Sequence, residues 1–515
     1  MQEKIVSFTK EDFRKYSTEE DFSRIVDIDT IPLFLDHIYK EYKDLNAISA
    51  SDGTLKTFLD LYFDSNKVAS FLKDAGIKKG DNVGVLALNS YQFACFALGT
   101  MALGGVSVMI PPQLDERTIF GLSKKFELKA LLYQKELETK TSLLNKSELV
   151  IEGEGVLEKD YPSISFDYSI KGGDACCIIM TGGTTGKSKG AVLSNEAVMA
   201  GTINGCYGLK DLFFKRYYSI IPLTHVFGFI RNLMTSLYTG SLIFFNKEKK
   251  MMFDEIRNAK PEVLVIVPAL AELFLNLVKA YGSIMIGGCV KHIVCGGASV
   301  PPYLITEYHK LGINFCAGYG LTEFSNMVSG NPEGLKNPES VGMLFPNQEG
   351  KIVDGELWLR GKNMMIGYYK EEEENNNAFS DGWFKTGDLA RFDEDNNLYI
   401  IGRIKDIIVL SNGENVSPAY IESKVNELPY IQDSLVTDVT NENGATVLQC
   451  EVVLRGGVIN NMGLEKDKIN DFVTKGVLEV NDKLQDFERI SKVIIRDKDF
   501  DRTPAMKIIR PKKVF

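Results

Sequence analysis

The strongest constraint on the fold is the alternation of short apolar runs with helical patterns. Residues 83–88 form a continuous apolar run typical of a buried strand. Residues 91–103 have the length and composition of a helix, and residues 106–110 predict a second strand. Similar runs predict strands at 130–133, 175–180, 219–221, 241–245, 263–267 and 291–294. Strands that alternate with helices indicate α/β layers with buried, largely parallel sheets.

The pattern changes after about residue 340. Short alternating strands with turn signals are expected at 355–360, 398–401 and 407–410. The acidic and asparagine-rich run 371–377 is expected to be a solvated loop. Beyond Ser417 the pattern is mixed again and ends in a basic tail. We place a domain boundary at residues 403–406, which gives domains 1–404 and 405–515.

Composition excludes several classes of protein. The 515 residues are 44% hydrophobic and 25% charged, unlike a disordered, collagen-like or coiled-coil chain. The net charge of −10 disfavours a nucleic-acid partner. We expect no signal peptide and no integral membrane segment, because the most apolar stretch, 263–278, is short and interrupted by polar residues. A cytoplasmic location follows as an expectation.

Cysteine and histidine spacing gives no metal motif. The eight cysteines contain no CxxC pair and are expected to be buried free thiols in a reducing compartment. The four histidines lack zinc-ligand spacing with another histidine or with a cysteine.

A Gly/Thr-rich segment follows the strand predicted to end at Met180. It runs from Thr181 to Gly190 and reads TGGTTGKSKG. Its glycines let backbone amides approach phosphate oxygens, its hydroxyls donate, and its lysines neutralise charge. These features predict a polyphosphate-binding loop. The segment is not a Walker A loop, because its glycine spacing is one residue short of that motif. A P-loop NTPase and a plain surface turn are the alternatives.

Further motifs follow this segment along the chain. They are residues 222–228 (PLTHVFG), 296–299 (GGAS), 319–323 (YGLTE), 383–388 (WFKTGD), 402–406 (GRIKD), 413–416 (GENV) and 503–510 (TPAMKIIR). Together with residues 181–190, they make the chain resemble the AMP-forming adenylating enzymes, which include acyl-CoA synthetases, peptide-synthetase adenylation domains and luciferases. The resemblance covers roughly residues 45–512. Ser188 and Met506 replace the family's usual proline and glycine. The resemblance implies a large N-terminal domain of layered α/β subdomains with a small β-barrel-like subdomain, and a small mobile α+β C-terminal domain.

The resemblance also assigns residues to ATP. Tyr319 offers an aromatic face to adenine, Asp388 accepts from the ribose hydroxyls, Arg403 donates to the same sugar, and Glu323 is an oxygen ligand for Mg²⁺. The remaining nucleotide-binding residues are Thr181, Gly182, Gly183, Thr184, Thr185, Gly186, Lys189, Gly297, Ala298, Ser299, Gly320, Thr322 and Lys507. Thr184 and Thr185 are also counted as catalytic, because they would contact the phosphates that react.

A two-step reaction is implied. A carboxylate attacks the α-phosphate of ATP, assisted by Lys507, and a thiol then attacks the acyl-adenylate. The small domain would turn about Lys405, so that Gly413, Glu414 and Asn415 come to line a tunnel for the thiol of CoA. His225 is expected to shape or gate the acid pocket rather than act as a base, and Phe227 and Gly228 would line that pocket.

The acid is expected to be a fatty or aryl carboxylic acid. Residues 224–229 contain no acidic side chain to pair with an α-ammonium group, so an amino acid is disfavoured. Phe324, Ser325 and Asn326 would admit some polarity to the pocket, and Cys295 and Cys316 would fill its wall. Three alternatives remain: a stand-alone enzyme that loads a carrier protein, a non-catalytic nucleotide-binding relative, and a Walker-type NTPase that releases ADP. A homodimer is compatible with the sequence.

Overall fold

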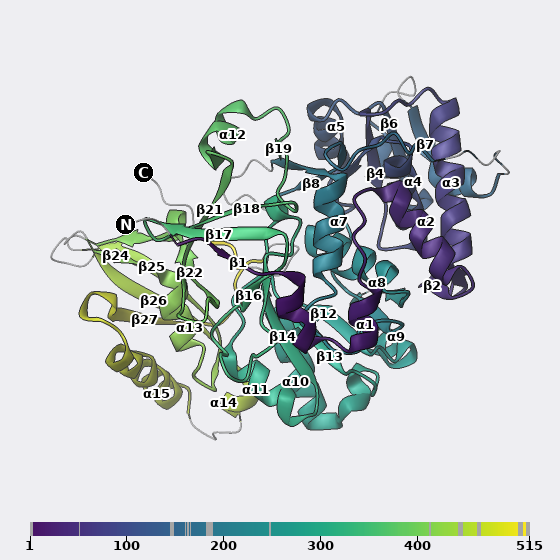
Figure 1. The fold of residues 1–515 in the computed structure, drawn as a ribbon. Coiled ribbons are helices and arrows are strands. Elements are labelled where there is room, and N and C mark those ends of the chain that lie inside the picture. The colour runs from purple at the N-terminus through teal and green to yellow at the C-terminus, as the bar shows by residue number, and fades with distance from the viewer. Residues whose placement is uncertain are drawn as a thin grey trace.

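The protein is described by a computed structural model that covers residues 4–50, 52–144, 149–159, 161, 164, 166–181, 189–246, 249–410, 414–440, 446–460, 465–502 and 508–510. Two large sheets, a smaller antiparallel sheet and a C-terminal group of elements form the molecule (Figure 1).

The first large sheet has seven strands. In spatial order they are β19 (Gly367–Tyr368), β9 (Gly190–Ser194), β8 (Ala175–Met180), β5 (Val106–Met109), β4 (Asn82–Leu86), β6 (Ala130–Tyr133) and β7 (Leu149–Glu152). The five from β8 to β7 are parallel. Strand β9 pairs antiparallel with β8, and β19 pairs antiparallel with β9. The intervening helices are α3 (Phe58–Asp74), α4 (Tyr91–Ala102), α5 (Glu116–Lys125), η2 (Lys135–Thr141) and α6 (Gly153–Leu157).

The second large sheet has nine strands. In spatial order they are β16 (Met343–Leu344), β15 (Ser329–Gly330), β14 (Asn314–Tyr319), β13 (His292–Cys295), β12 (Val263–Ile266), β10 (Arg216–Ser219), β11 (Leu242–Phe245), β2 (Asn46–Ser49) and β3 (Leu55–Thr57). The run from β14 to β2 is parallel. Its helices are α2 (Ile31–Tyr42), α7 (Asn195–Asn204), η3 (Phe227–Met234), α8 (Thr235–Tyr238), η4 (Lys249–Met251), α9 (Met252–Ala259), α10 (Pro268–Tyr281), η5 (Ser283–Ile286) and α11 (Pro302–Lys310).

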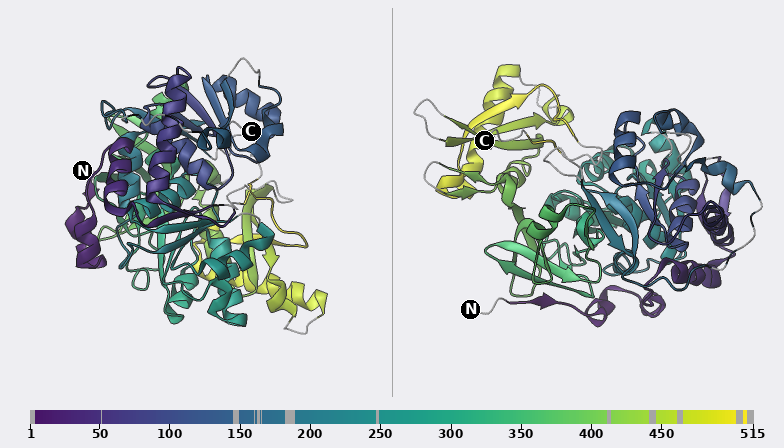
Figure 2. Two further views of the ribbon diagram at one scale, coloured as in Figure 1. Left: turned by 90° about the vertical axis from the view of Figure 1, so that its right-hand side faces the viewer. Right: turned by 90° about the horizontal axis from the view of Figure 1, so that it is seen from above.

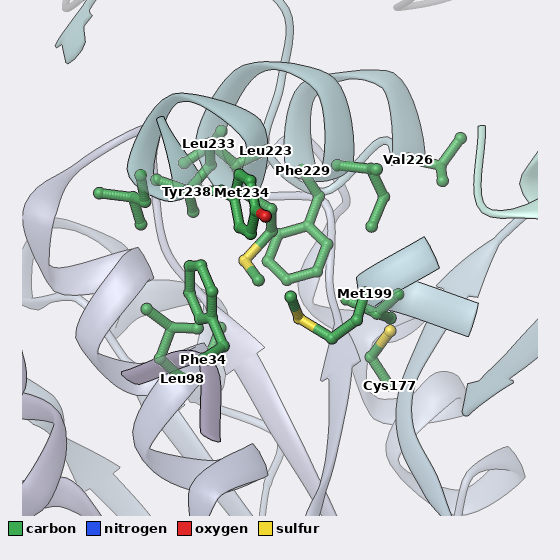
Figure 3. Close-up of a cluster of buried hydrophobic side chains, with 14 of the residues drawn as sticks. Phe34, Leu98, Cys177, Met199, Leu223, Val226, Phe229, Leu233, Met234 and Tyr238 are labelled. Atoms are coloured by element: carbon green, nitrogen blue, oxygen red, sulfur yellow. The ribbon is translucent and has the colours of Figure 1, made fainter. Parts of the chain in front are cut away.

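A large apolar core joins the layers of these two sheets. Helix η3 contributes Phe229, Leu233 and Met234, which point toward Phe34 of α2 and Leu98 of α4 (Figure 3). The burial of these side chains is a main source of stability for this half of the molecule. The apolar face of η3 is therefore packed against α2 and α4.

The smaller antiparallel sheet follows the two large ones. Its strands are β1 (Val6–Ser7), β17 (Gln348–Val353), β18 (Glu356–Gly361), β21 (Trp383–Phe392) and β20 (Phe379–Ser380), with β22 (Leu398–Arg403) paired to β21. The pairings of the described residues run as an open path from β1 to β20, so the expected barrel-like unit is an open sheet here. Beside these elements lie η1 (Lys10–Tyr16), α1 (Glu19–Arg24), η6 (Thr322–Phe324), α12 (Glu372–Ala378) and η7 (Ile404–Asp406).

The C-terminal elements stand to one side of the rest (Figure 2). They are β23 (Ile408–Val409), β24 (Asn415–Val416), α13 (Pro418–Val425), β25 (Ile431–Thr440), β26 (Thr446–Leu454), α14 (Gly456–Asn460), α15 (Lys466–Glu479), η8 (Val480–Lys483), η9 (Asp486–Glu488) and β27 (Ile490–Arg496). Strands β25, β26 and β27 form one sheet with its own apolar core, and β23 pairs with β24.

The predicted α/β class with largely parallel sheets is confirmed, as is a large N-terminal region followed by a small C-terminal one. The boundary at residue 405 stays a prediction. Two local expectations were wrong. The strand expected at 219–221 is β10, at Arg216–Ser219, because its hydrophobic face comes from Tyr217 and the chain turns toward Pro222. The expected loop at 371–377 contains helix α12, where acidic residues suit a helix N-terminus.

The eight cysteines are free thiols, seven of them buried, as predicted. Among the described residues, no helix has both the length and the apolar character needed to cross a bilayer.

Candidate active site

Asp388 lies between Tyr319 and Arg403, two residues that the sequence assigned to the same nucleotide. Strand β14 ends at Tyr319, and the register of β21 and β22 pairs Asp388 directly with Arg403. Tyr319 Oη donates to Asp388 Oδ2 at 2.5 Å, and Arg403 Nε lies 3.0 Å from Asp388 Oδ1. Asp388 is only 2% exposed. The structure thus brings together the residues expected at adenine and ribose.

Burial and the charge of Asp388 set the protonation of this cluster. Burial, followed by the negative charge of Asp388, raises the pKa of Tyr319 well above its usual value. The charge of Asp388 also raises the pKa of Arg403. Tyr319 is consequently a neutral donor and Arg403 a cation at any pH near neutrality. Desolvation and the charge of Arg403 lower the pKa of Lys405, the expected hinge residue in η7.

Gly320 allows the turn that carries Glu323. A Cβ atom at Gly320 would lie 1.3 Å from the carbonyl oxygen of Asn326, so only glycine fits. The chain then enters η6, which holds buried Thr322 and half-buried Glu323.

Tyr368 and Glu374, which the sequence analysis did not identify, contact Glu323 and Lys189. Tyr368 Oη donates to Glu323 Oε1 at 2.7 Å, and Lys189 forms an ion pair with Glu374 of α12. Lys189 Nζ also lies 4.9 Å from the centre of the Tyr368 ring. The pairing of β19 with β9 sets Tyr368 opposite Ala191, and no local pattern distinguishes Tyr368 from its neighbours in the sequence.

Glu323 fits the expected role at Mg²⁺. It is a hard oxygen donor, and in the described part of the chain no three metal-ligating side chains gather. Mg²⁺ commonly takes one or two carboxylates together with substrate phosphates and waters. Glu323 could hold the ion in this way, and the ion would then supply neutralisation of phosphate charge.

The predicted phosphate loop connects β8 to β9. Its flanks are described: the Thr181 amide donates to the Lys189 carbonyl at 2.8 Å, next to the Met180–Gly190 strand pair. The two strands that flank the loop are therefore held together as an antiparallel pair, and Lys189, immediately before β9, lies beside Tyr368 and Glu374. Five predicted phosphate-binding residues lie outside the described residues: Gly182, Gly183, Thr184, Thr185 and Gly186.

The predicted acid-side motif packs against the predicted nucleotide-side turn. The Phe227 amide donates to His225 Nδ1 at 3.2 Å, which places the proton of a neutral ring on Nε2. A Cβ atom at Gly228 would lie 2.1 Å from the Pro222 carbonyl oxygen. A Cβ atom at Gly297 would meet the Phe227 ring at 4.0 Å, so the two motifs are neighbours. Ala298 and Ser299, the next two residues of that turn, are exposed.

The remaining groups assigned to the two reaction steps lie C-terminal to η7 in the sequence. Glu414 precedes β24 and Asn415 begins it, and both are exposed. Gly413 and Lys507 fall outside the described residues, so their roles stay predictions.

Comparison with known proteins agrees with this geometry. The AMP-binding enzyme family matches residues 35–369, and the AMP-binding enzyme C-terminal domain matches residues 405–514. The "Probable CoA ligase CCL5" of Humulus lupulus is 28% identical over 507 residues, which cover 90% of this chain and 88% of that protein. The 2-succinylbenzoate–CoA ligase of Bacillus cereus is 25% identical over 434 residues, covering 81% and 86%.

Solved structures share the fold. An anthranilate CoA ligase in complex with anthranoyl-AMP superposes with a TM-score of 0.81 at 19% identity, covering 93% of this chain and 95% of that one. The o-succinylbenzoate CoA synthetase of Bacillus subtilis with its acyl-adenylate gives 0.77 at 21% identity, covering 93% and 96%.

The chain belongs to the AMP-binding enzyme family, whose model spans well over half of it. The CoA ligases named above are similar to it along most of their own length.

Proposed function

We propose that this protein activates a fatty or aryl carboxylic acid with ATP and transfers the acyl group to CoA. The observation that carries the proposal is the placement of Asp388 between Tyr319 and Arg403, next to the turn that carries Glu323. These residues come from three separate segments and meet at the carboxyl end of β14, where open α/β sheets commonly bind nucleotides.

In the first step a carboxylate oxygen attacks the α-phosphorus of ATP. The bond to the bridging oxygen breaks, and pyrophosphate leaves. The carboxylate is already a nucleophile, so we assign the protein the tasks of positioning and charge neutralisation. Asp388 and Arg403 would hold the ribose, Lys189 and the phosphate loop the phosphates, and Lys507 the reacting oxygens.

In the second step the thiol sulfur attacks the acyl carbon. AMP leaves and the thiol gives up its proton. We assign Lys405 to the rotation of the C-terminal domain, and Gly413, Glu414 and Asn415 to the thiol tunnel. His225 would close the acid pocket, because its Nδ1 already accepts from the Phe227 amide.

Product analysis tests the proposal. With ATP, Mg²⁺ and pools of carboxylic acids, we expect AMP and pyrophosphate to form only with certain acids, and an acyl-CoA to form when CoA is added. An acyl-adenylate without thioester would favour the alternative acceptor, a carrier-protein pantetheine. Release of ADP, or ATP binding without turnover, would contradict the proposal. The cytoplasmic location and a homodimer stay predictions from the sequence.

A further inference from the structure

Arg231 is the most unusual buried residue of the molecule. It lies in helix η3 and is 1% exposed. It is among the largest side chains that are fully buried. Its Nη1 has no hydrogen-bond partner, and within the described residues no carboxylate pairs with it. A buried guanidinium with no carboxylate beside it and with Nη1 left without an acceptor is unfavourable, because the interior replaces only part of its hydration. An acceptor supplied by a ligand would complete its hydrogen bonds.

Within helix η3, Arg231 lies on a different face from Phe229, Leu233 and Met234. In a π-helix the backbone bonds join residues five apart, so residues about four to five apart share a face. Phe229, Leu233 and Met234 face the first layer (Figure 3). Phe227 and Arg231, four residues apart, therefore share the other face, which is turned toward the second sheet.

Arg231 lies deeper inside the molecule than the predicted nucleotide-side turn at residues 296–299. Phe227 is next to Gly297. Burial raises the pKa of the Cys316 thiol to about 11, and the charge of Arg231 opposes that rise, so the guanidinium is near Cys316. Cys316 precedes Tyr319 by three residues on β14, away from the strand's carboxyl end. An acid whose carboxylate reacts at that end would extend past Phe227 toward Arg231.

Other polar atoms near Arg231 also lack partners. Burial raises the pKa of Tyr217 and the charge of Arg231 opposes the rise, which places Tyr217 close to the guanidinium. The Tyr217 hydroxyl is the neutral group beside the guanidinium, although its geometry falls short of a well-formed hydrogen bond. Both amide atoms of Asn232, the next residue of η3, are buried without a hydrogen-bond partner. Unsatisfied buried groups are rare in native proteins, and several together indicate a place for a polar group from outside the chain.

We propose that the acid substrate carries a second carboxylate at the end distal to the one that is activated, and that Arg231 binds it. The inference rests on the proposed function and narrows its substrate to fatty or aryl acids with an anionic end. An apolar end would leave the guanidinium unpaired, so the site should reject it far more strongly than a size difference alone would achieve.

Matched acid pairs test this inference by ATP–pyrophosphate exchange. Each pair is a dicarboxylic acid and its monomethyl ester, taken from an alkyl series and from a carboxyphenylpropanoate series. We expect kcat/KM for the best diacid to exceed that of its ester by at least about 100-fold. Exchange that favours the esters in every pair would overturn the inference while leaving the proposed function intact. Absence of exchange with every acid would overturn both.

Variants separate recognition from structural support. In R231M the diacid-to-ester ratio should fall to about one, and R231K should keep part of it. The control R257M removes an exposed arginine that pairs with Asp254 on α9, and should keep the ratio. R231M should also unfold at the same or a higher temperature, because an unpaired buried charge is lost. A lower unfolding temperature with equal losses for both acids would show a structural role and overturn the inference.

Discussion

The nucleotide side and the C-terminal part are held in different ways. On the proposed nucleotide side, Asp388 is 2% exposed and contacts Tyr319 and Arg403. Asp388 and Arg403 lie on paired strands of the smaller antiparallel sheet, and Tyr319 ends a strand of the second large sheet. The C-terminal part has its own core, and its contacts with the rest include polar side chains.

Two of those contacts are ion pairs. Arg455 Nη2 lies 2.5 Å from Glu272 Oε1 and donates to Tyr303 Oη at 3.2 Å, and Lys424 Nζ lies 2.9 Å from Glu339 Oε1. Polar contacts between domains can be exchanged with little loss, whereas a buried sheet cannot. We infer from this difference that the proposed ATP site is formed in advance, whereas the proposed second step depends on movement of the C-terminal part.

The largest effect is expected for K507A. Removing a cation from the reacting oxygens should lower adenylation by about 10²–10³-fold, because such charge stabilisation acts in the transition state. Thioester formation from a supplied acyl-adenylate should continue, as measured by single-turnover assays of each step. Equal loss of both steps would remove the functional distinction between the two regions.

Next in size is the effect of K405P at η7. Proline fixes φ, so the variant should resist the proposed rotation. Adenylation should persist while thioester formation drops by an order of magnitude or more, since hinge residues govern such steps. The two half-reactions are again measured separately, with K475A, which loses only an exposed pair with Glu479 within α15, as the control. Unchanged thioester formation would place the hinge elsewhere.

D388N sharpens the account of the nucleotide side. The amide keeps the shape of the Asp388 side chain but loses its negative charge. The carboxylate that pairs with Arg403 and accepts a hydrogen bond from Tyr319 is thereby removed. Charge-assisted hydrogen bonds contribute about 1.5–3 kcal/mol, so the Kd for ATP should rise by about 10–100-fold. Calorimetric titration measures it, with D381N, at a turn residue with positive φ, as the control. An unchanged Kd would exclude Asp388 from ATP binding.

The buried His292 should make the N-terminal region sensitive to acid. Burial lowers its pKa to about 4, against 6.5 when unfolded. Between these values the unfolded chain binds the proton, so stability falls as pH decreases, by about 3 kcal/mol in total. Unfolding in denaturant at pH 7 and pH 4.5 should show a smaller pH effect in H292F. An identical effect in both proteins would assign the acid sensitivity to other groups.

R455A should have the smallest effect. It breaks the contact of the C-terminal part with α10 and leaves Glu272 unpaired. Burial already raises the pKa of Glu272, so the carboxyl can take up a proton instead. We expect a change of a few-fold in the balance of the two half-reactions and easier proteolysis near residues 403–406. R489A, which loses an exposed ion pair with Asp486, is the control. No change would mean that this contact does not hold the observed orientation.

The sequence yields candidate site residues because the motifs that carry them are local. A glycine-rich loop after a strand, a Tyr-Gly turn and a Thr-Gly-Asp segment each have a spacing that a single backbone conformation requires. Strand positions were predicted where apolar runs are continuous, as at β6 and β8, and failed at β10, where the strand is rich in tyrosine.

Contacts between distant segments were beyond the sequence. Tyr368 reaches Glu323 only because β19 pairs with β9, and Arg231 is buried only because η3 lies between two sheets. The identity of the functional groups and their order along the chain follow from the sequence alone. The tertiary structure decided which of them meet and which lose water, because strand register and layer packing are set by the whole buried surface and not by any one segment.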